Sequence, residues 1–130
     1  MPAGIEWSVK LKMLDKEKKV RLLQEYADNA KEIARLEKEL SFWSARSEHD
    51  DEIRKLTSLL SKSLAAASAK ALLIERAVAQ VEDSKLRLLL TYHYLDGLTW
   101  EQTADAMDMD VRWVFRLRAR ALESLNISTT

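Results

Sequence analysis

The 130-residue sequence predicts an all-α fold, and three observations support this expectation. Glycine occurs only as Gly4 and Gly97 and proline only as Pro2, so residues 5–96 contain neither of the strong helix breakers. The same stretch is rich in Ala, Leu, Lys, Glu and Arg, which are good helix formers. No apolar–polar alternation with a period of two, the pattern of a half-buried strand, interrupts it.

Two apolar stripes then predict two long helices. The first stripe consists of Leu23, Tyr26, Ala30, Ile33, Leu36, Leu40 and Trp43, and the second of Ile53, Leu56, Leu60, Leu64, Ala67, Ala71, Ile74, Val78 and Val81. Steps of three and four residues place each stripe on one helix face, and the second stripe comes close to a heptad repeat. Because the polar segment 44–51 reads as a turn, we expect residues 1–83 to form a long, coiled-coil-like antiparallel helical hairpin. A spare apolar stripe on this hairpin would allow a homodimer.

A second unit is predicted over residues 84–130. Asp83 and Ser84 interrupt the second stripe, and Ser84 can cap a new helix. Gly97 follows Asp96 and can adopt the left-handed backbone conformation that ends a helix. Thr99 comes next, with Gln102 three residues later, which is the spacing of a capping box. A short helix is therefore expected after Thr99.

This short helix and the segment after it have the pattern of a helix-turn-helix. Trp100, Ala104 and Met107 give the short helix an apolar face, and the small Ala104 suits a close helix crossing. The turn is expected at residues 107–109, and Asp110 can cap a final helix over about residues 111–125.

The final helix divides into two faces when its residues are placed 100° apart. One face, expected to pack on the earlier helices, carries Val114, Leu117, Ala121 and Leu125. The opposite face carries Arg112, Phe115, Arg116, Ala119 and Arg120. The three arginines have i, i+4, i+8 spacing and form one cationic stripe.

This cationic stripe predicts an interaction with double-stranded DNA. Overall the chain has 21 basic and 21 acidic residues, so its positive charge has to be confined to one face for DNA to bind. The planar fork of arginine can bond a guanine edge or a phosphate through two hydrogen bonds. The N-terminal half of a recognition helix faces the major groove, so Arg112 and Arg116 are expected to reach bases and Arg120 a phosphate. Phe115 could contact a thymine methyl group or pack against protein.

The C-terminal 45 or so residues resemble region 4 of sigma-70-type transcription factors. The resemblance is closest to small phage- and prophage-encoded regulators, in which a helical segment precedes such a module. It is carried by Tyr94-Leu95-Asp96-Gly97, Thr99-Trp100-Glu101, Ala104, Val114, Arg116-Leu117 and Arg120-Ala121-Leu122. The resemblance implies DNA contacts by Val111, Arg112, Phe115 and Arg116, with Arg120 nearby, and a possible contact with RNA polymerase. Thr103 and Asp108 depart from it, because an aliphatic residue and a glycine are usual there.

The function that we expect is sequence-specific regulation of transcription in the cytoplasm, without a cofactor. A small terminase subunit of phage type and a helical protein-interaction adaptor are the alternatives, because both use similar helical parts. No catalytic motif is recognisable, and the sequence does not predict an enzyme. The chain has no cysteine, and the acidic cluster 48–52 reads as a flexible turn rather than a metal site. No apolar run approaches the roughly 20 residues of a membrane span, and no membrane partner is expected.

Overall fold

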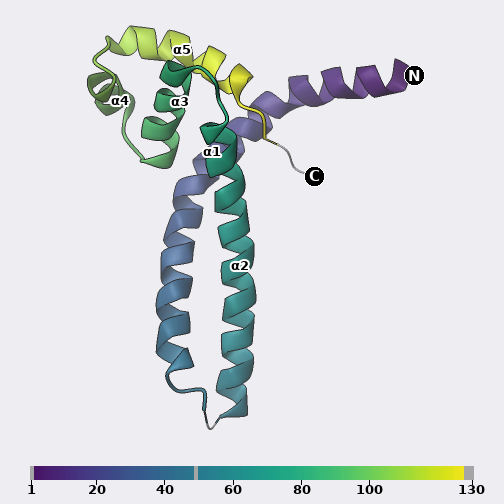
Figure 1. Cartoon of the computed structure of the whole chain (residues 1–130), viewed down its shortest axis with the longest axis vertical. Coiled ribbons are helices and arrows are strands. Elements are labelled where there is room, and N and C mark those ends of the chain that lie inside the picture. Colours follow the sequence, from purple (N-terminus) through teal and green to yellow (C-terminus); the bar gives the residue numbers. More distant parts are fainter. Residues whose placement is uncertain (1, 49, 128–130) are drawn as a thin grey trace.

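The fold is all-α, as predicted. The computed structural model describes residues 2–48 and 50–127, with side chains from residue 16 onward, and every regular element within these ranges is a helix. In chain order the elements are α1 (Pro2–Ser44), α2 (Asp51–Ala79), α3 (Ser84–Leu90), the short π-helical segment η1 (Thr91–Leu95), α4 (Trp100–Ala106) and α5 (Val111–Ser124). Figure 1 shows α2 beside much of α1, with the shorter elements gathered at one end of this pair.

Helices α1 and α2 run in opposite directions and pack against each other (Figure 1). The hydroxyl of Tyr26 donates a hydrogen bond of 2.6 Å to Glu75 Oε1, and the Asn29 amide donates one of 2.9 Å to the carbonyl of Ala67. Burial and this bond to Glu75 raise the pKa of Tyr26 to about 12. The buried residues of the pair all belong to the two predicted stripes or adjoin them; they are Leu23, Leu36, Leu60, Ala71, Ile74, Ala77 and Val78.

The connection between α1 and α2 lies within the predicted polar turn. Helix α1 ends at Ser44, and Asp50 caps α2 by accepting hydrogen bonds from the backbone N–H groups of Glu52 and Ile53 at 2.9 and 3.3 Å. His49, a member of the acidic cluster weighed as a metal site, lies outside the described residues. Among the residues that are described, no group of three metal-ligating side chains comes together.

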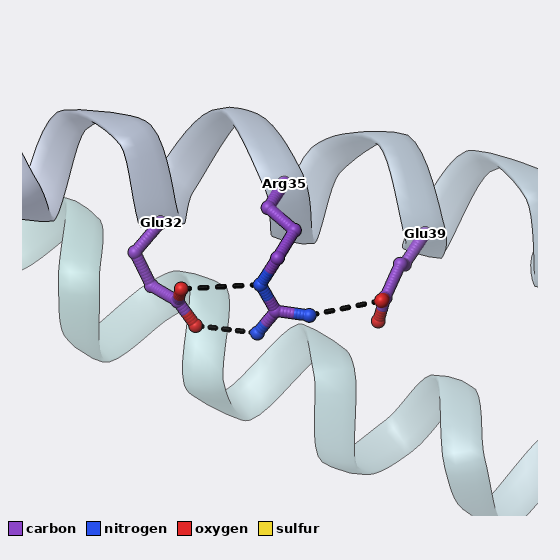
Figure 2. A network of polar contacts seen from close by, with 3 residues as sticks. All are labelled: Glu32, Arg35 and Glu39. Carbon is purple, nitrogen blue, oxygen red and sulfur yellow. Dashed lines mark hydrogen bonds and ion pairs between the residues drawn. The ribbon is translucent and has the colours of Figure 1, made fainter.

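A chain of ion pairs lies on the exposed side of α1. Figure 2 shows the guanidinium of Arg35 bonded to both carboxylate oxygens of Glu32 on one side and to Glu39, at 2.9 Å, on the other. The hydrogen bonds from Arg35 lower the pKa of Glu32. All three side chains are solvent-exposed, so water and salt screen these pairs and they add little to stability.

The start of α3 corrects one prediction. Asp83, not Ser84, caps the helix, because its carboxylate accepts hydrogen bonds from the N–H groups of Lys85 and Leu86 at 2.9 and 3.3 Å. Ser84 is the first helical residue. The carboxylate of Asp83 reaches the free N–H groups of the first turn from one position earlier, so Ser84 is not needed as the cap.

One apolar core joins the end of the α1–α2 pair to the C-terminal helices, which are α3, η1, α4 and α5. The core consists of Leu23, Ile74, Ala77, Val78, Val81, Leu86, Leu89, Leu90, Tyr94, Ala104, Val114, Ala121, Leu122 and Leu125. Lys19 also links the two parts, since its ammonium donates a hydrogen bond of 3.1 Å to the carbonyl of Leu122 near the end of α5. A cation at this end of a helix complements the helix dipole.

Helix α3 continues into η1, whose hydrogen bonds span more residues than those of an α-helix. Asp96 N–H donates to the carbonyl of Thr91 at 2.8 Å, and Leu98 N–H donates to that of Tyr92 at 3.0 Å. Gly97 ends the segment with a φ of 75°, the left-handed conformation that was predicted for it. Within the part of the chain that is described, no helix has the length and apolar character needed to cross a membrane.

Candidate nucleic-acid interface

A tight connection sets the angle between α4 and α5. It runs from Met107 to Asp110, and Asp108 adopts a left-handed conformation with a φ of 55°. This is the position at which the resemblance led us to expect glycine, and aspartate is among the few other residues that tolerate this conformation. Met109 N–H closes the turn by donating to the carbonyl of Ala104 at 2.9 Å. The carboxylate of Asp110 then caps α5 by accepting from Arg112 N–H at 2.9 Å, as predicted.

Helix α4 begins with the predicted capping box. Thr99 Oγ1 accepts from Gln102 N–H at 3.1 Å, and the Gln102 side chain accepts from Thr99 N–H at 2.9 Å. Ala104 is buried where α4 meets its neighbours. Thr103 is fully buried beside it, and its hydroxyl has no hydrogen-bond partner among the described residues. Thr103 thus places a buried hydroxyl at a position where the resemblance led us to expect an aliphatic side chain.

One face of α5 packs on the core. Val114, Ala121 and Leu125 are buried, and Leu117 is half-buried, as the two-face prediction requires. Burying several apolar side chains along one face fixes the rotation of α5 about its axis. The opposite face is therefore directed to solvent.

The outward face of α5 carries the predicted arginines. Arg112, Arg116 and Arg120 are exposed, and Phe115 is 50% exposed. Val111, by contrast, is half-buried and packs against the core. We refer to Arg112, Arg116 and Arg120 as the arginine stripe. None of the three forms an ion pair with a carboxylate of the described residues.

Trp113 is an additional exposed residue on this face that the sequence argument did not assign. Its side chain is 57% exposed, and the guanidinium carbon of Arg116 lies 5.1 Å from its ring centroid. Stacking on an aromatic face holds an arginine in place without using its hydrogen-bond donors. The signal in the sequence was the i, i+3 spacing of these two residues on a helix.

A groove adjoins the arginine stripe. It has a volume of about 600 Å³ and lies between the start of α3, the α4–α5 connection and α5. Leu86, Met109, Trp113 and Leu117 supply its apolar lining, and its charged lining consists of Asp83, Lys85, Asp108, Asp110 and Arg120. The groove extends the outward face of α5 beyond the arginines.

An aromatic stack of η1 and α4 contacts α5 through Phe115. The rings of His93 and Trp100 are stacked with centroids 3.6 Å apart, and Phe115 lies 5.5 Å from Trp100. His93 Nδ1 lies 2.8 Å from the carbonyl of Leu98, so this nitrogen carries a proton and donates it. Burial, with a contribution from the positive charge of Arg118, lowers the pKa of His93 despite that hydrogen bond. Burial and the nearby positive charge thus favour the neutral imidazole.

Within α4, its connection to α5 and α5 itself, positive charge is confined to α5. This helix contains four arginines and one acidic residue, Glu123, whereas α4 and its connection to α5 contain exposed Glu101, Asp105, Asp108 and Asp110. A polyanion would therefore be attracted to the outward face of α5 and repelled by the exposed side of α4. No family model matches the chain, and no curated protein or solved structure matches it either.

Proposed function

We propose that the chain is a sequence-specific DNA-binding regulator of transcription, in which α4, its connection and α5 act as a helix-turn-helix. The observation that carries this proposal is the arginine stripe on the outward face of α5. Three exposed arginines repeat every four residues on a helix whose opposite face is buried. A helix with these two faces can enter the major groove while its other side stays anchored in the protein.

The roles of the residues follow from their positions along α5. Arg112 and Arg116 lie in its N-terminal half and would bond guanine edges, while Arg120 would bond a phosphate. The stacking of Arg116 on Trp113 would orient its guanidinium for that contact. Phe115 would meet a thymine methyl group with the part of its ring that Trp100 does not cover. Val111 would contact DNA only with the part of its side chain that is not packed against the core.

The proposed regulator is of phage or prophage type, and its α1–α2 pair is the helical hairpin that precedes the module. The exposed Phe42 and Leu59, at 50% and 62%, lie on this hairpin and support a homodimer formed through it. Two copies joined in this way would present two α5 helices to two half-sites on double-stranded DNA. RNA polymerase would be a second partner, and the place of action would be the cytoplasm.

Recovery of bound fragments from sheared genomic DNA tests this function. The protein is mixed with the fragments at low and moderate salt, and the bound fragments are sequenced. We expect them to share a short motif and to lie beside promoters, with weaker recovery at the higher salt. Fragments without a common motif would contradict sequence-specific binding. A motif beside packaging genes, with a ring-like assembly in solution, would instead indicate a small terminase subunit.

A protein-interaction adaptor is the second candidate, and a specific observation favours it. Trp113 and Phe115 expose large apolar surfaces next to the arginines, and tryptophan and arginine often dominate protein interfaces. The adaptor would bind a protein through the same face of α5. Absence of salt-sensitive DNA affinity, together with such a partner, would favour it over the regulator.

A further inference from the structure

A second pocket lies on a different side of α5 from the arginine stripe. It has a volume of about 280 Å³ and is formed by α1, η1, α4 and α5. The residues that give it its chemistry are Gln24, His93, Tyr94, Trp100 and Arg118. At 3.6 residues per turn, Arg118 points roughly 160° away from Arg116 around α5. DNA bound along the stripe would therefore leave this pocket open.

Arg118 is the cation of this pocket, and none of the described residues supplies a counter-ion for it. Its side chain is half-buried, its Nε donates to the hydroxyl of Tyr94 at 3.3 Å, and its guanidinium carbon lies 5.7 Å from the ring centroid of Trp100. No carboxylate oxygen of the described residues lies within 4.0 Å of its nitrogens. A charge that is partly removed from water gains most from an anion that can reach it.

The other residues of the pocket favour an anion as well. Gln24 brings an amide N–H₂ donor, and His93, with its Nδ1 proton bonded to the Leu98 carbonyl, becomes a donor at both nitrogens when it is protonated. Among the described residues, no acidic side chain lines the pocket. The stacked rings of His93 and Trp100 add aromatic surface to the lining. The pocket thus combines a cation and hydrogen-bond donors with aromatic rings.

We propose that this pocket binds a small oxyanion, a phosphate or a carboxylate. Two oxygens of the ligand pair with the fork of Arg118, and the amide of Gln24 donates to a third. The volume of the pocket suits a ligand of a few atoms, since pockets for larger ligands begin at about 300 Å³. Because the pocket joins the α1–α2 pair to the C-terminal helices, a bound anion stabilises their packing.

Thermal unfolding and calorimetry with inorganic phosphate and with malonate test the proposal, at constant ionic strength against chloride. We expect a saturable rise of Tm with the anion and a binding isotherm with one site. Arg118→Gln should weaken this binding by about tenfold or more, because a charge-assisted bidentate pair is lost. Arg54→Gln, at an exposed arginine of α2 that does not line the pocket, is the matched control and should bind like the original protein. Equal anion effects in both variants, or no saturable effect in the original protein, would overturn the proposal.

Further measurements distinguish a separate anion site from two alternatives. In one, the variants merely change folding; in the other, Arg118 contacts a phosphate of DNA. Gln24→Ala leaves Arg118 in place and should weaken phosphate binding with an unchanged circular dichroism spectrum. Phosphate should also raise the pKa of His93, measured from its ring proton resonances, because a bound anion favours the imidazolium. If Arg118→Gln reduced DNA affinity and its salt dependence as much as Arg116→Gln does, Arg118 would be a DNA contact and the separate site would be refuted.

Discussion

The imidazole of His93 lies flat on the indole of Trp100, with ring centroids 3.6 Å apart and ring planes inclined by 16°. His93 belongs to η1 and Trp100 is the first residue of α4, so the stack fixes the two elements on either side of Gly97. Phe115 of α5 adds a further contact, with its ring centroid 5.5 Å from that of Trp100. The orientation of α5 thus depends on an aromatic contact as well as on its apolar face.

The state of His93 predicts that stability falls in mild acid. The pKa of His93 is lowered in the folded protein, so the unfolded chain takes up its proton first as the pH falls below about 6.5. Between that value and the lowered pKa, the unfolded state binds more protons and stability decreases with falling pH. Thermal unfolding between about pH 7.5 and pH 5 should show this loss. His93→Phe keeps a ring on Trp100 and should flatten the dependence. An unchanged pH dependence in this variant would contradict the assignment to His93.

Thr103 predicts a stabilising substitution. Its hydroxyl is fully buried and has no partner within the described chain, so Thr103→Val removes a polar group and keeps the shape. The free energy of unfolding should rise by about 1 kcal/mol. Thr91→Val is the matched control, because the hydroxyl of Thr91 donates to the carbonyl of Arg87 at 2.8 Å and its loss should destabilise. Urea unfolding of both variants measures the difference; a loss of stability in Thr103→Val would contradict the enclosed, unpaired hydroxyl.

The hydrogen bond between Tyr26 and Glu75 predicts that its removal lowers the stability of the α1–α2 pair. Tyr26→Phe removes a 2.6 Å hydrogen bond to a carboxylate and little else, and it should lower the free energy of unfolding by about 1 kcal/mol. Tyr92→Phe, which removes a hydroxyl without a hydrogen bond in the described residues, should have a smaller effect. Equal effects of the two changes in urea unfolding would show that the bond does not stabilise the pair.

Much of this structure could be predicted from local patterns. The absence of glycine and proline from residues 5–96 indicated long helices, and the cap residues Thr99 and Asp110 fixed the starts of α4 and α5. These signals act within one or two turns of the chain. The exposed arginines followed from the same reasoning, because the period of a helix determines which residues share a face.

Features that depend on distant contacts were not predicted. Lys19 bonds the carbonyl of a residue 103 positions away, and no periodic pattern relates the two. The pocket around Arg118 combines side chains of four elements, and the sequence placed Arg118 on neither face of α5 in particular. No pattern of residue types predicts the π-helical hydrogen bonds of η1 either, since the sequence of Thr91–Leu95 also suits an α-helix. The cap of α3 is Asp83 and not the predicted Ser84, because aspartate and serine are equally good caps and the sequence offers both side by side.

Arg120 predicts a change in the salt dependence of DNA binding. If Arg120 bonds a phosphate, Arg120→Ala should weaken binding to specific and unrelated DNA alike and reduce the slope of log K against log salt by about 1. Arg54→Ala removes an exposed arginine of α2 and should leave the slope unchanged. A loss restricted to one DNA sequence would assign Arg120 to a base rather than to a phosphate.

Fluorescence anisotropy with a labelled DNA fragment that carries the recovered motif tests the central claim most directly. The variant Arg112→Ala/Arg116→Ala removes two arginines from the outward face of α5, and Arg35→Ala/Arg54→Ala removes two exposed arginines from the α1–α2 pair. We expect the first variant to lose at least about 30-fold in affinity, since each base contact discriminates by about 1–3 kcal/mol. The second variant should bind like the original protein. Equal affinity of all three proteins for the fragment would contradict DNA recognition by α5.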